Sequence, residues 1–363
     1  MLSSKTCCKK KSLPFKTQLK LTFVALVFQL TSVGFGSELI SAKTDSLIRA
    51  GIRLSVQQSF DEAQAIFSEL QHEMPDNPVG YFFQAAVLQT QMMDKEIYDQ
   101  EAEFVELIEK SISFSKARIK KVAEDPWAYF FLGSSLGYLA FQNAKQKQFN
   151  WAFQVGMKSV QALEMALKKD STLYDAYLGL GTYKYYRSKL SRHFKWLPFV
   201  KDDRRAGISM LKIAIKKSRY SRYSAMNSFC WIALVEEQYE QGWQLAERAL
   251  MEFPQSRVFL WCAAKLADKM ERWPEAIRFY RQILASFKSQ NLFSPYNEAV
   301  CRKNLLRLYL QQEDFDLAEQ ECAKIQALKV RVGSEKRVAD VLKEFLRACQ
   351  RLGETAPLGD KSE

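Results

Sequence analysis

The sequence has few of the residues on which metal sites usually depend. It contains only two histidines, His72 and His193, and they lie far apart along the chain. None of its seven cysteines forms a Cys-x-x-Cys pair, and no His-x-x-x-His or His-Glu-x-x-His spacing occurs. Zinc is held by such donors at such spacings. The sequence therefore predicts no metal site.

The sequence also lacks phosphate-binding loops, and it shows no activated nucleophile. No Gly-x-x-x-x-Gly-Lys or Gly-x-Gly-x-x-Gly loop is present, and Gly179 and Gly181 lie in a helical pattern with no strand before them. We interpret those two as packing glycines, and we place no serine in a nucleophile elbow. Paired carboxylates such as Glu236–Glu237 and Glu313–Asp314 fit solvated helix ends. We expect no catalytic residues and no cofactor.

Glycine and proline are scarce, at 14 and 9 of 363 residues, and runs of β-branched residues are short. The chain is dominated by lysine, glutamate, glutamine, leucine and alanine, which lose little rotamer freedom in a helix. Apolar residues make up 47% of the chain, which is ample for a core. The composition therefore predicts an all-α protein.

The amino terminus resembles a targeting segment. The apolar stretch from Leu21 to Leu30 is too short for a comfortable membrane span. Six lysines precede it, and the small residues Gly34, Gly36 and Ser37 follow it. This order predicts a secretory signal peptide over residues 1–36, and hence an exported, periplasmic or secreted protein. The alternative is an anchor that is not cleaved.

Cleavage would change the charge and the cysteine count. The chain carries a formal charge of +12, and loss of the six lysines in residues 1–36 would leave +6. Five cysteines would remain, an odd number without the tight spacing of a disulfide framework. We expect most of them to pack as small apolar residues. Their spacing identifies no disulfide pair. The five are Cys230, Cys262, Cys301, Cys322 and Cys349.

An internal repeat is the clearest signal of fold. Ala63, Phe67 and Pro75 stand at the spacings of the second helix of a tetratricopeptide repeat, and Gly51 stands twelve residues before Ala63. A small residue on each helix lets the two backbones approach, and the aromatic ring fills the space beneath. The segment resembles the tetratricopeptide family, which implies a right-handed α-solenoid of helix pairs.

The same phase returns towards the carboxy terminus. Gly242 and Ala276 are 34 residues apart, the period of this family. Cys230 and Ala264 each stand twelve residues before one of them. We therefore predict about seven helix pairs over residues 43–352, with a capping helix from Val332 to Leu352. We expect residues 353–363 to form a disordered tail.

The middle of the chain departs from the family spacing. Gly133 and Ser159 are 26 residues apart, and so are Gly181 and Gly207, where the family has twelve. Together with the overlong unit from Tyr81 to Lys121, these predict three long hairpins with protruding ends or inserted loops. Exported bacterial tetratricopeptide proteins with long central hairpins are similar in outline.

A basic, aromatic segment lies in this middle region. From Lys184 to Arg222 there are thirteen basic residues and only two acidic ones, Asp202 and Asp203. Cations between aromatic rings suit an anionic lipid surface, so one interpretation is membrane docking. The other is a solvated loop whose rings fold back onto the solenoid. Export argues against nucleic acid. The patch residues are Lys184, Arg187, Lys189, Arg192, Lys195, Trp196, Phe199, Lys201, Arg204 and Arg205.

A second candidate surface follows from the resemblance. In the tetratricopeptide family the inner face of the first helix of each pair lines a groove, and here those positions are aromatic, which suits a peptide or helix. The alternative is that overlong hairpins close the groove and the rings form core. The residues are Phe82, Trp127, Phe130, Tyr138, Tyr185, Tyr186, Trp231 and Trp261.

The resulting hypothesis is a non-enzymatic scaffold that binds a protein or peptide in an aromatic groove. The alternative is a membrane-surface adaptor that docks on anionic lipid through residues 184–222. A helical enzyme is a third and weaker hypothesis, because no donor set supports it.

Overall fold

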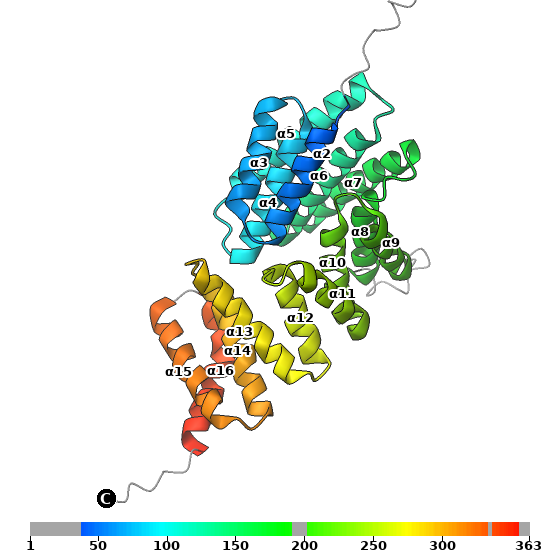
Figure 1. The fold of residues 1–363 in the computed structure, drawn as a ribbon. Helices are drawn as coiled ribbons and strands as arrows, with labels where there is room; N and C mark the ends of the chain where they lie inside the picture. Colours follow the sequence, from blue (N-terminus) through cyan, green and yellow to red (C-terminus); the bar gives the residue numbers. More distant parts are fainter. Residues whose placement is uncertain (1–37, 191–201, 333–335, 356–363) are drawn as a thin grey trace, which may run out of the picture. The chain divides into compact units, whose positions relative to one another are not determined.

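The computed structural model describes residues 38–190, 202–332 and 336–355. The chain divides into two units, Met1–Leu39 and Ile40–Glu363, and every helix discussed below belongs to the second unit. The predicted signal peptide and residues 191–201 of the basic segment lie outside the described residues. In the described part all regular structure is helical (Figure 1).

The helices form seven consecutive antiparallel pairs and one final helix, which confirms the predicted all-α solenoid. The pairs are α2 (Ala42–Val56) with α3 (Phe60–Glu73), α4 (Pro78–Lys95) with α5 (Glu101–Lys121), α6 (Pro126–Lys145) with α7 (Phe149–Lys169), α8 (Ala176–Leu190) with α9 (Arg204–Lys217), α10 (Arg222–Val235) with α11 (Tyr239–Glu252), α12 (Arg257–Lys269) with α13 (Trp273–Ser289), and α14 (Pro295–Gln311) with α15 (Phe315–Val332). The last helix is α16 (Lys336–Thr355).

Local sequence accounts for many helix boundaries. Asn77 and Asp125 cap α4 and α6 by accepting hydrogen bonds from backbone N–H groups, and a proline follows each of them at the first helical position. Tight turns inside the pairs need a left-handed residue, and the chain uses non-glycine residues there. Glu96, Lys147 and Glu271 have φ of 56°, 63° and 58°. The low glycine content of the sequence is therefore compatible with these tight turns.

The small residues predicted to sit between paired helices do so. A Cβ on Gly51 would lie 2.3 Å from the ring of Phe67, so only glycine lets that ring approach. In α6 and α7 the Oγ of Ser159 donates to the carbonyl of Gly133 at 2.6 Å. A Cβ on Gly181 would lie 2.7 Å from the carbonyl oxygen of Gly207. The repeat phase read from the sequence is therefore correct in these pairs.

The three central hairpins are lengthened in two ways. In the second and third pairs the helices themselves are long, with 18 and 21 residues in α4 and α5 and 20 and 21 in α6 and α7. In the fourth pair the helices have ordinary lengths of 15 and 14 residues, and the extra residues lie between Leu190 and Arg204. The predicted longer hairpins thus occur in the second and third pairs, and the insertion predicted for the fourth pair falls on residues 191–201, outside the described residues.

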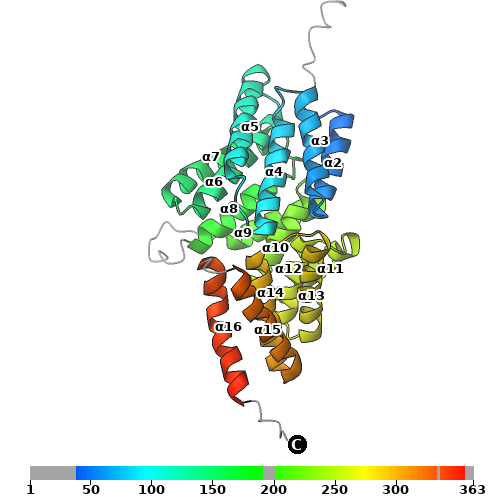
Figure 2. The same cartoon turned by 90° about the vertical axis from the view of Figure 1, so that its left-hand side faces the viewer.

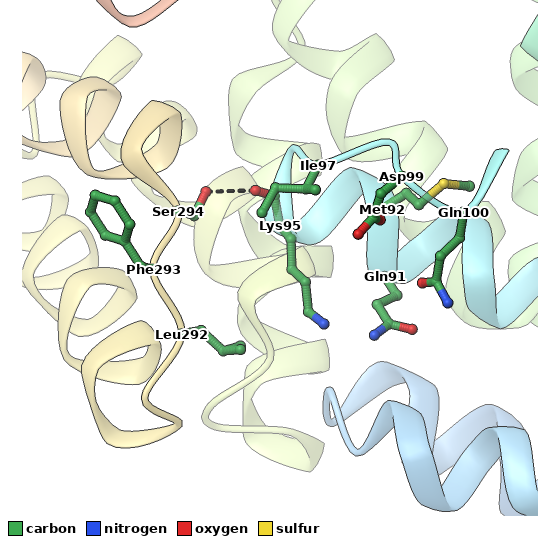
Figure 3. Close-up of a pocket in the computed structure, with 9 residues that line it drawn as sticks. All are labelled: Gln91, Met92, Lys95, Ile97, Asp99, Gln100, Leu292, Phe293 and Ser294. Carbon is green, nitrogen blue, oxygen red and sulfur yellow. Dashed lines mark hydrogen bonds between the residues drawn. The ribbon is translucent and has the colours of Figure 1, made fainter. Parts of the chain in front are cut away.

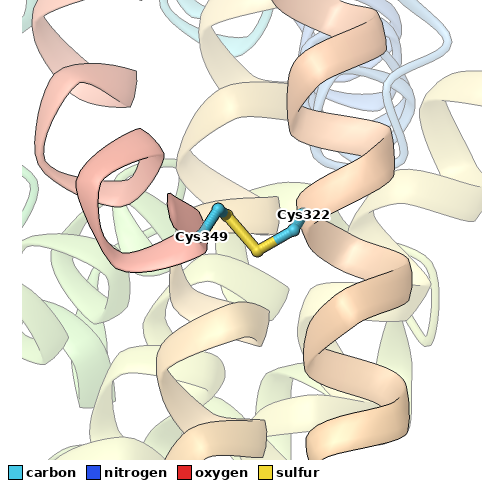
Figure 4. The surroundings of a disulfide bond; sticks show 2 residues. All are labelled: Cys322 and Cys349. Carbon is cyan, nitrogen blue, oxygen red and sulfur yellow. A yellow bond between two sulfur atoms is a disulfide. The ribbon is translucent and has the colours of Figure 1, made fainter. Parts of the chain in front are cut away.

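Successive first helices contact one another from α2 to α12, and each second helix packs against the following pair (Figures 1 and 2). At the end of the stack α16 contacts α14 and α15 and buries Val338, Leu342 and Phe345 in their core. A disulfide joins Cys322 of α15 to Cys349 of α16 (Figure 4). The predicted capping helix is confirmed, although it begins four residues later and ends three residues later than the sequence indicated.

The first helix pairs also contact later ones. Arg53 at the end of α2 pairs with Glu252 at the end of α11 at 2.5 Å. The Oγ of Ser294, just before α14, donates to the carbonyl of Lys95 at 2.6 Å. Arg337 at the start of α16 pairs with Glu96 at 2.7 Å. The solenoid therefore folds back on itself through polar contacts between segments about two hundred residues apart.

Candidate functional site

Four of the predicted groove aromatics lie together in a packed cluster. Phe82 and Phe130 are 5% and 4% exposed, and Trp127 and Tyr138 are partly buried. The ring of Phe82 lies 5.5 Å from Tyr138 and 6.3 Å from Phe130, and Trp127 lies 5.4 Å from Phe130. In this part of the chain the rings form core between α4 and α6.

The segment before α10 covers this cluster. The ring of Tyr220 lies 5.4 Å from Trp127, and its hydroxyl donates to Asp45 of α2 at 2.6 Å. The carboxylate of buried Asp175 fixes the segment by accepting from the backbone N–H groups of Arg219, Tyr220 and Ser221 at 2.7–2.8 Å. The folding back of the solenoid thus adds a contact over Trp127, whereas Phe82 and Phe130 are buried by rings of α4 and α6 themselves.

Asp45 is the electrostatic centre of that contact. Partial burial raises the pKa of Asp45, but hydrogen bonds from Arg219, Tyr220 and Arg49 outweigh it and lower the pKa to about 2. The Arg219 guanidinium lies 2.8 Å from the carboxylate. Asp45 therefore stays ionised and holds α2 against the start of α10.

The next two aromatics differ in accessibility. Tyr185 is fully buried, its hydroxyl donates to Glu236 at 2.8 Å, and burial together with that carboxylate raises its pKa. Its neighbour Tyr186 is 42% exposed, with the two rings 5.1 Å apart. Tyr185 is a structural residue, whereas Tyr186 presents its ring to solvent.

The two predicted groove tryptophans of α10 and α12 differ in exposure. Trp231 of α10 is 38% exposed, and its indole N–H donates to Asn227 one turn earlier at 3.0 Å. Trp261 of α12 is partly buried, 6.1 Å from the ring of Tyr280. Asn227 also accepts from the thiol of Cys262 at 3.4 Å, which links α10 to α12. Tyr186, Trp231 and Trp261 thus lie on three successive first helices.

Polar side chains that the sequence analysis missed continue this row. Lys265 donates to Asn304 of α14 at 3.2 Å, and burial lowers its pKa. Arg307 of α14 pairs with Asp268 of α12 at 2.5 Å. The signal was helical spacing, because Asn227 precedes Trp231 by four residues and Lys265 follows Trp261 by four, so each shares a face with a predicted aromatic.

Two of the five described residues of the basic patch, Arg187 and Arg204, are neutralised in ion pairs. Arg187 pairs with Asp203 at 2.5 Å, and Arg204 pairs with both Asp202 and Glu236. Lys184 and Lys189 are partly buried and Arg205 is exposed. The other predicted patch residues lie outside the described residues: Arg192, Lys195, Trp196, Phe199 and Lys201. The sequence count missed Glu236, which comes from the following pair.

No catalytic or metal-binding arrangement stands out among the described residues. They contain no cluster of three or more His, Cys, Asp or Glu side chains fit to hold a metal ion. The unpaired thiols of Cys262 and Cys301 are buried, and burial raises their pKa values, which disfavours the thiolate. Among the helices that the structure describes, none combines the length and apolar character that a membrane crossing needs.

One serine has the sequence spacing of a nucleophile elbow but not its structure. Residues 133–137 read Gly-Ser-Ser-Leu-Gly, which has the Gly-x-Ser-x-Gly spacing of a nucleophile elbow. Here the pattern lies inside α6, and Ser135 is fully buried with its hydroxyl 2.9 Å from that of Ser111. An elbow needs a strand-to-helix turn with an exposed serine, so this serine packs two helices together.

A small cavity of about 210 Å³ lies where the turn after α4 meets the segment before α14 (Figure 3). Its lining is mixed, with Met92, Ile97 and Leu292 beside Gln91, Lys95 and Asp99. The hydrogen bond from Ser294 to the carbonyl of Lys95 crosses one side of it. The volume is below the range usual for small-molecule sites.

Fold and surface together define an α-solenoid of tetratricopeptide-like helix pairs. No family model matches the chain, and no curated protein matches it. Solved structures with a similar fold include PilW, described as a widely conserved type IV pilus biogenesis factor, with 12% identity, a TM-score of 0.47, and coverage of 70% of this chain and 99% of that one.

Two further structures are similar to this chain. One is the carboxy-terminal part of a TPR repeat-containing protein from Cytophaga hutchinsonii, with 15% identity, a TM-score of 0.42, and coverage of 81% and 99%. The other is the human IFIT1 dimer with m7Gppp-AAAA, with 13% identity, a TM-score of 0.40, and coverage of 93% and 83%. At these identities and TM-scores the functions of the three proteins are not a guide to this one.

Proposed function

We propose that the protein is an exported, non-enzymatic scaffold that binds a protein or peptide partner along the first helices of its fourth, fifth and sixth pairs. The observation that carries the proposal is a row of aromatic rings on α8, α10 and α12, in which Tyr186 and Trp231 are exposed and Trp261 is partly buried. Large aromatic rings with a polar handle supply much of the binding energy at protein interfaces.

Polar groups beside the row add the means for specificity. Asn227 and Lys265 offer an amide and an ammonium group one helical turn from Trp231 and Trp261. Rings that give contact area and amides that can bond to a backbone together suit a peptide segment. The five other predicted groove residues, Phe82, Trp127, Phe130, Tyr138 and Tyr185, have structural roles in the proposed scaffold.

Site-specific photocrosslinking in envelope extract tests this surface. A photoreactive amino acid at position 231 or 261 is expected to give a discrete adduct with one protein. The matched control is position 251, because Met251 is 81% exposed but lies on the second helix α11. Equal adducts at 231 and 251, or none at 231 and 261, would contradict the proposal.

Export is supported by the cysteines. Cys322 and Cys349 pair in a disulfide, and structural disulfides persist mainly in oxidising compartments such as the periplasm. Together with the signal-like residues 1–36, this favours a protein outside the cytosol. Amino-terminal sequencing of the native protein should find a start close to Ser37. Recovery of the chain from the cytosol with Met1 retained would refute export.

A further inference from the structure

The connected ends of α6 and α7 expose large apolar side chains that no role in the fold explains. Every residue from Lys145 to Trp151 is exposed, so this end of the hairpin projects into solvent (Figure 2). Phe149, Trp151 and Phe153 are 66%, 61% and 55% exposed. Met157, which is also exposed, shares a helix face with Phe149 and Phe153, because the three are spaced by four residues.

The rest of α7 is firmly held, so these side chains are presented by a rigid element. Val155 and Gly156 are buried one turn beyond the exposed rings. A Cβ on Gly156 would lie 3.6 Å from the ring of Tyr183 in α8, an ordinary contact distance. Exposed large side chains thus surround the start of α7, with Phe149, Phe153 and Met157 on one face and Trp151 on the opposite face. Exposed apolar surface marks a site of interaction.

Within the segment that forms α6 and most of α7 the charge has one sign. No aspartate or glutamate occurs from Pro126 to Leu163, and the only charged residues in that span are Lys145, Lys147 and Lys158. Lys145 lies over the ring of Tyr98 at 3.5 Å. Glu101 of α5 approaches from one side, where it accepts a hydrogen bond from Gln146 at 3.3 Å. In the described region no carboxylate forms an ion pair with Lys147 or Lys158.

We propose that this end of the α6–α7 hairpin docks onto an anionic lipid surface. Phe149, Trp151 and Phe153 enter the headgroup region, and Lys147 and Lys158 contact anionic headgroups. Aromatic rings favour the membrane interface, and nearby cations add affinity for anionic lipid. A projecting end with bulky rings fits a deformable lipid surface, whereas a folded partner would need a matching hollow. This proposal is independent of the partner-binding face on α8, α10 and α12.

Vesicle flotation of the full chain tests the proposal. Binding is expected to vesicles of equal phosphatidylglycerol and phosphatidylcholine at low salt, and to be much weaker to phosphatidylcholine alone. Changing Phe149, Trp151 and Phe153 to serine should weaken binding more than about tenfold. Each of Lys147→Gln and Lys158→Gln should weaken it about fivefold. The matched control is Phe315→Ser, because Phe315 is the first residue of α15 and 54% exposed.

The amino-terminal residues also carry lysines and an apolar stretch, so a readout specific to the hairpin is needed. Brominated lipid in the same vesicles should quench Trp151 fluorescence, and Trp151→Phe should remove that quenched component. Quenching that Trp151→Phe leaves unchanged would overturn the proposal. So would equal binding by the serine triple variant and Phe315→Ser, or no binding to anionic vesicles. The last result would assign the surface to an acidic protein partner instead.

Discussion

Arg257 and Asp94 form a buried ion pair between helices that are 163 residues apart in sequence. Their side chains are 0% and 3% exposed, and the closest nitrogen and oxygen atoms are 2.6 Å apart. The guanidinium also donates to Ser286 and Gln290, each at 2.8 Å. The end of α4 is thereby fixed to the start of α12.

Breaking this pair is expected to destabilise the protein strongly. Arg257→Met leaves the Asp94 carboxylate buried without its partner, which should lower the free energy of unfolding by about 3–5 kcal/mol. The control is Arg272→Met, because Arg272 and Glu240 form an exposed pair at 3.4 Å, and that loss should stay below about 1 kcal/mol. Urea denaturation measures both. Equal losses would mean that the Arg257–Asp94 pair contributes little to the stability of the fold.

Two glycines in paired helices should respond to alanine with opposite signs. Gly51→Ala forces a methyl group into the ring of Phe67, so we expect a loss of about 1–3 kcal/mol. Gly156→Ala meets only ordinary contacts and removes a flexible residue from a helix, so we expect a gain of about 0.5–1 kcal/mol. Melting temperatures of the two variants test this. If Gly51→Ala were more stable than the wild type, the predicted phase of the repeat would be wrong.

Ala276→Leu should also lower the free energy of unfolding, by about 1–3 kcal/mol, because Ala276 of α13 is buried.

Asp45 should make stability depend on acid pH. Its pKa in the folded protein, about 2, lies below the ordinary aspartate value of 3.8. A carboxyl group with a depressed pKa stabilises the fold above its unfolded pKa, and this contribution is lost as the pH falls from about 4 to about 2. Asp45→Asn should be less stable than wild type at neutral pH, and the difference should shrink over that range. A difference that stays constant with pH would argue against this role.

Reduction of the disulfide should loosen the capping helix. Cys322 and Cys349 close a loop with a sequence separation of 27, and a loop of this size contributes about 3 kcal/mol. A reducing agent should lower the melting temperature of the wild type and speed amide hydrogen exchange in α16. Cys349→Ser should show the same exchange with or without the agent. If the reducing agent did not change amide hydrogen exchange in α16 of the wild type, the disulfide would not stabilise this helix.

The repeat could be predicted from sequence because its determinants are local. Gly51 with Phe67, and Gly181 with Gly207, meet within one helix pair, so their spacing reveals the contact. The contact of Trp127 with Tyr220 could not be predicted in this way. It depends on the folding back of the chain, which the ion pair of Asp94 with Arg257 holds together across 163 residues. Trp231 stays exposed on the predicted face, whereas Trp261 is partly buried beside Tyr280 of α13.

The contact between Arg257 and Asp94 has a consequence for how the chain unfolds. Linear repeat arrays lose their ends one unit at a time, because each repeat touches only its neighbours. Here the second pair also touches the sixth and seventh through Asp94, Ser294 and Asn297. Fraying of either end therefore removes contacts from the other. The chain should melt as one cooperative unit, and deletion of the first pairs should weaken the last ones as well.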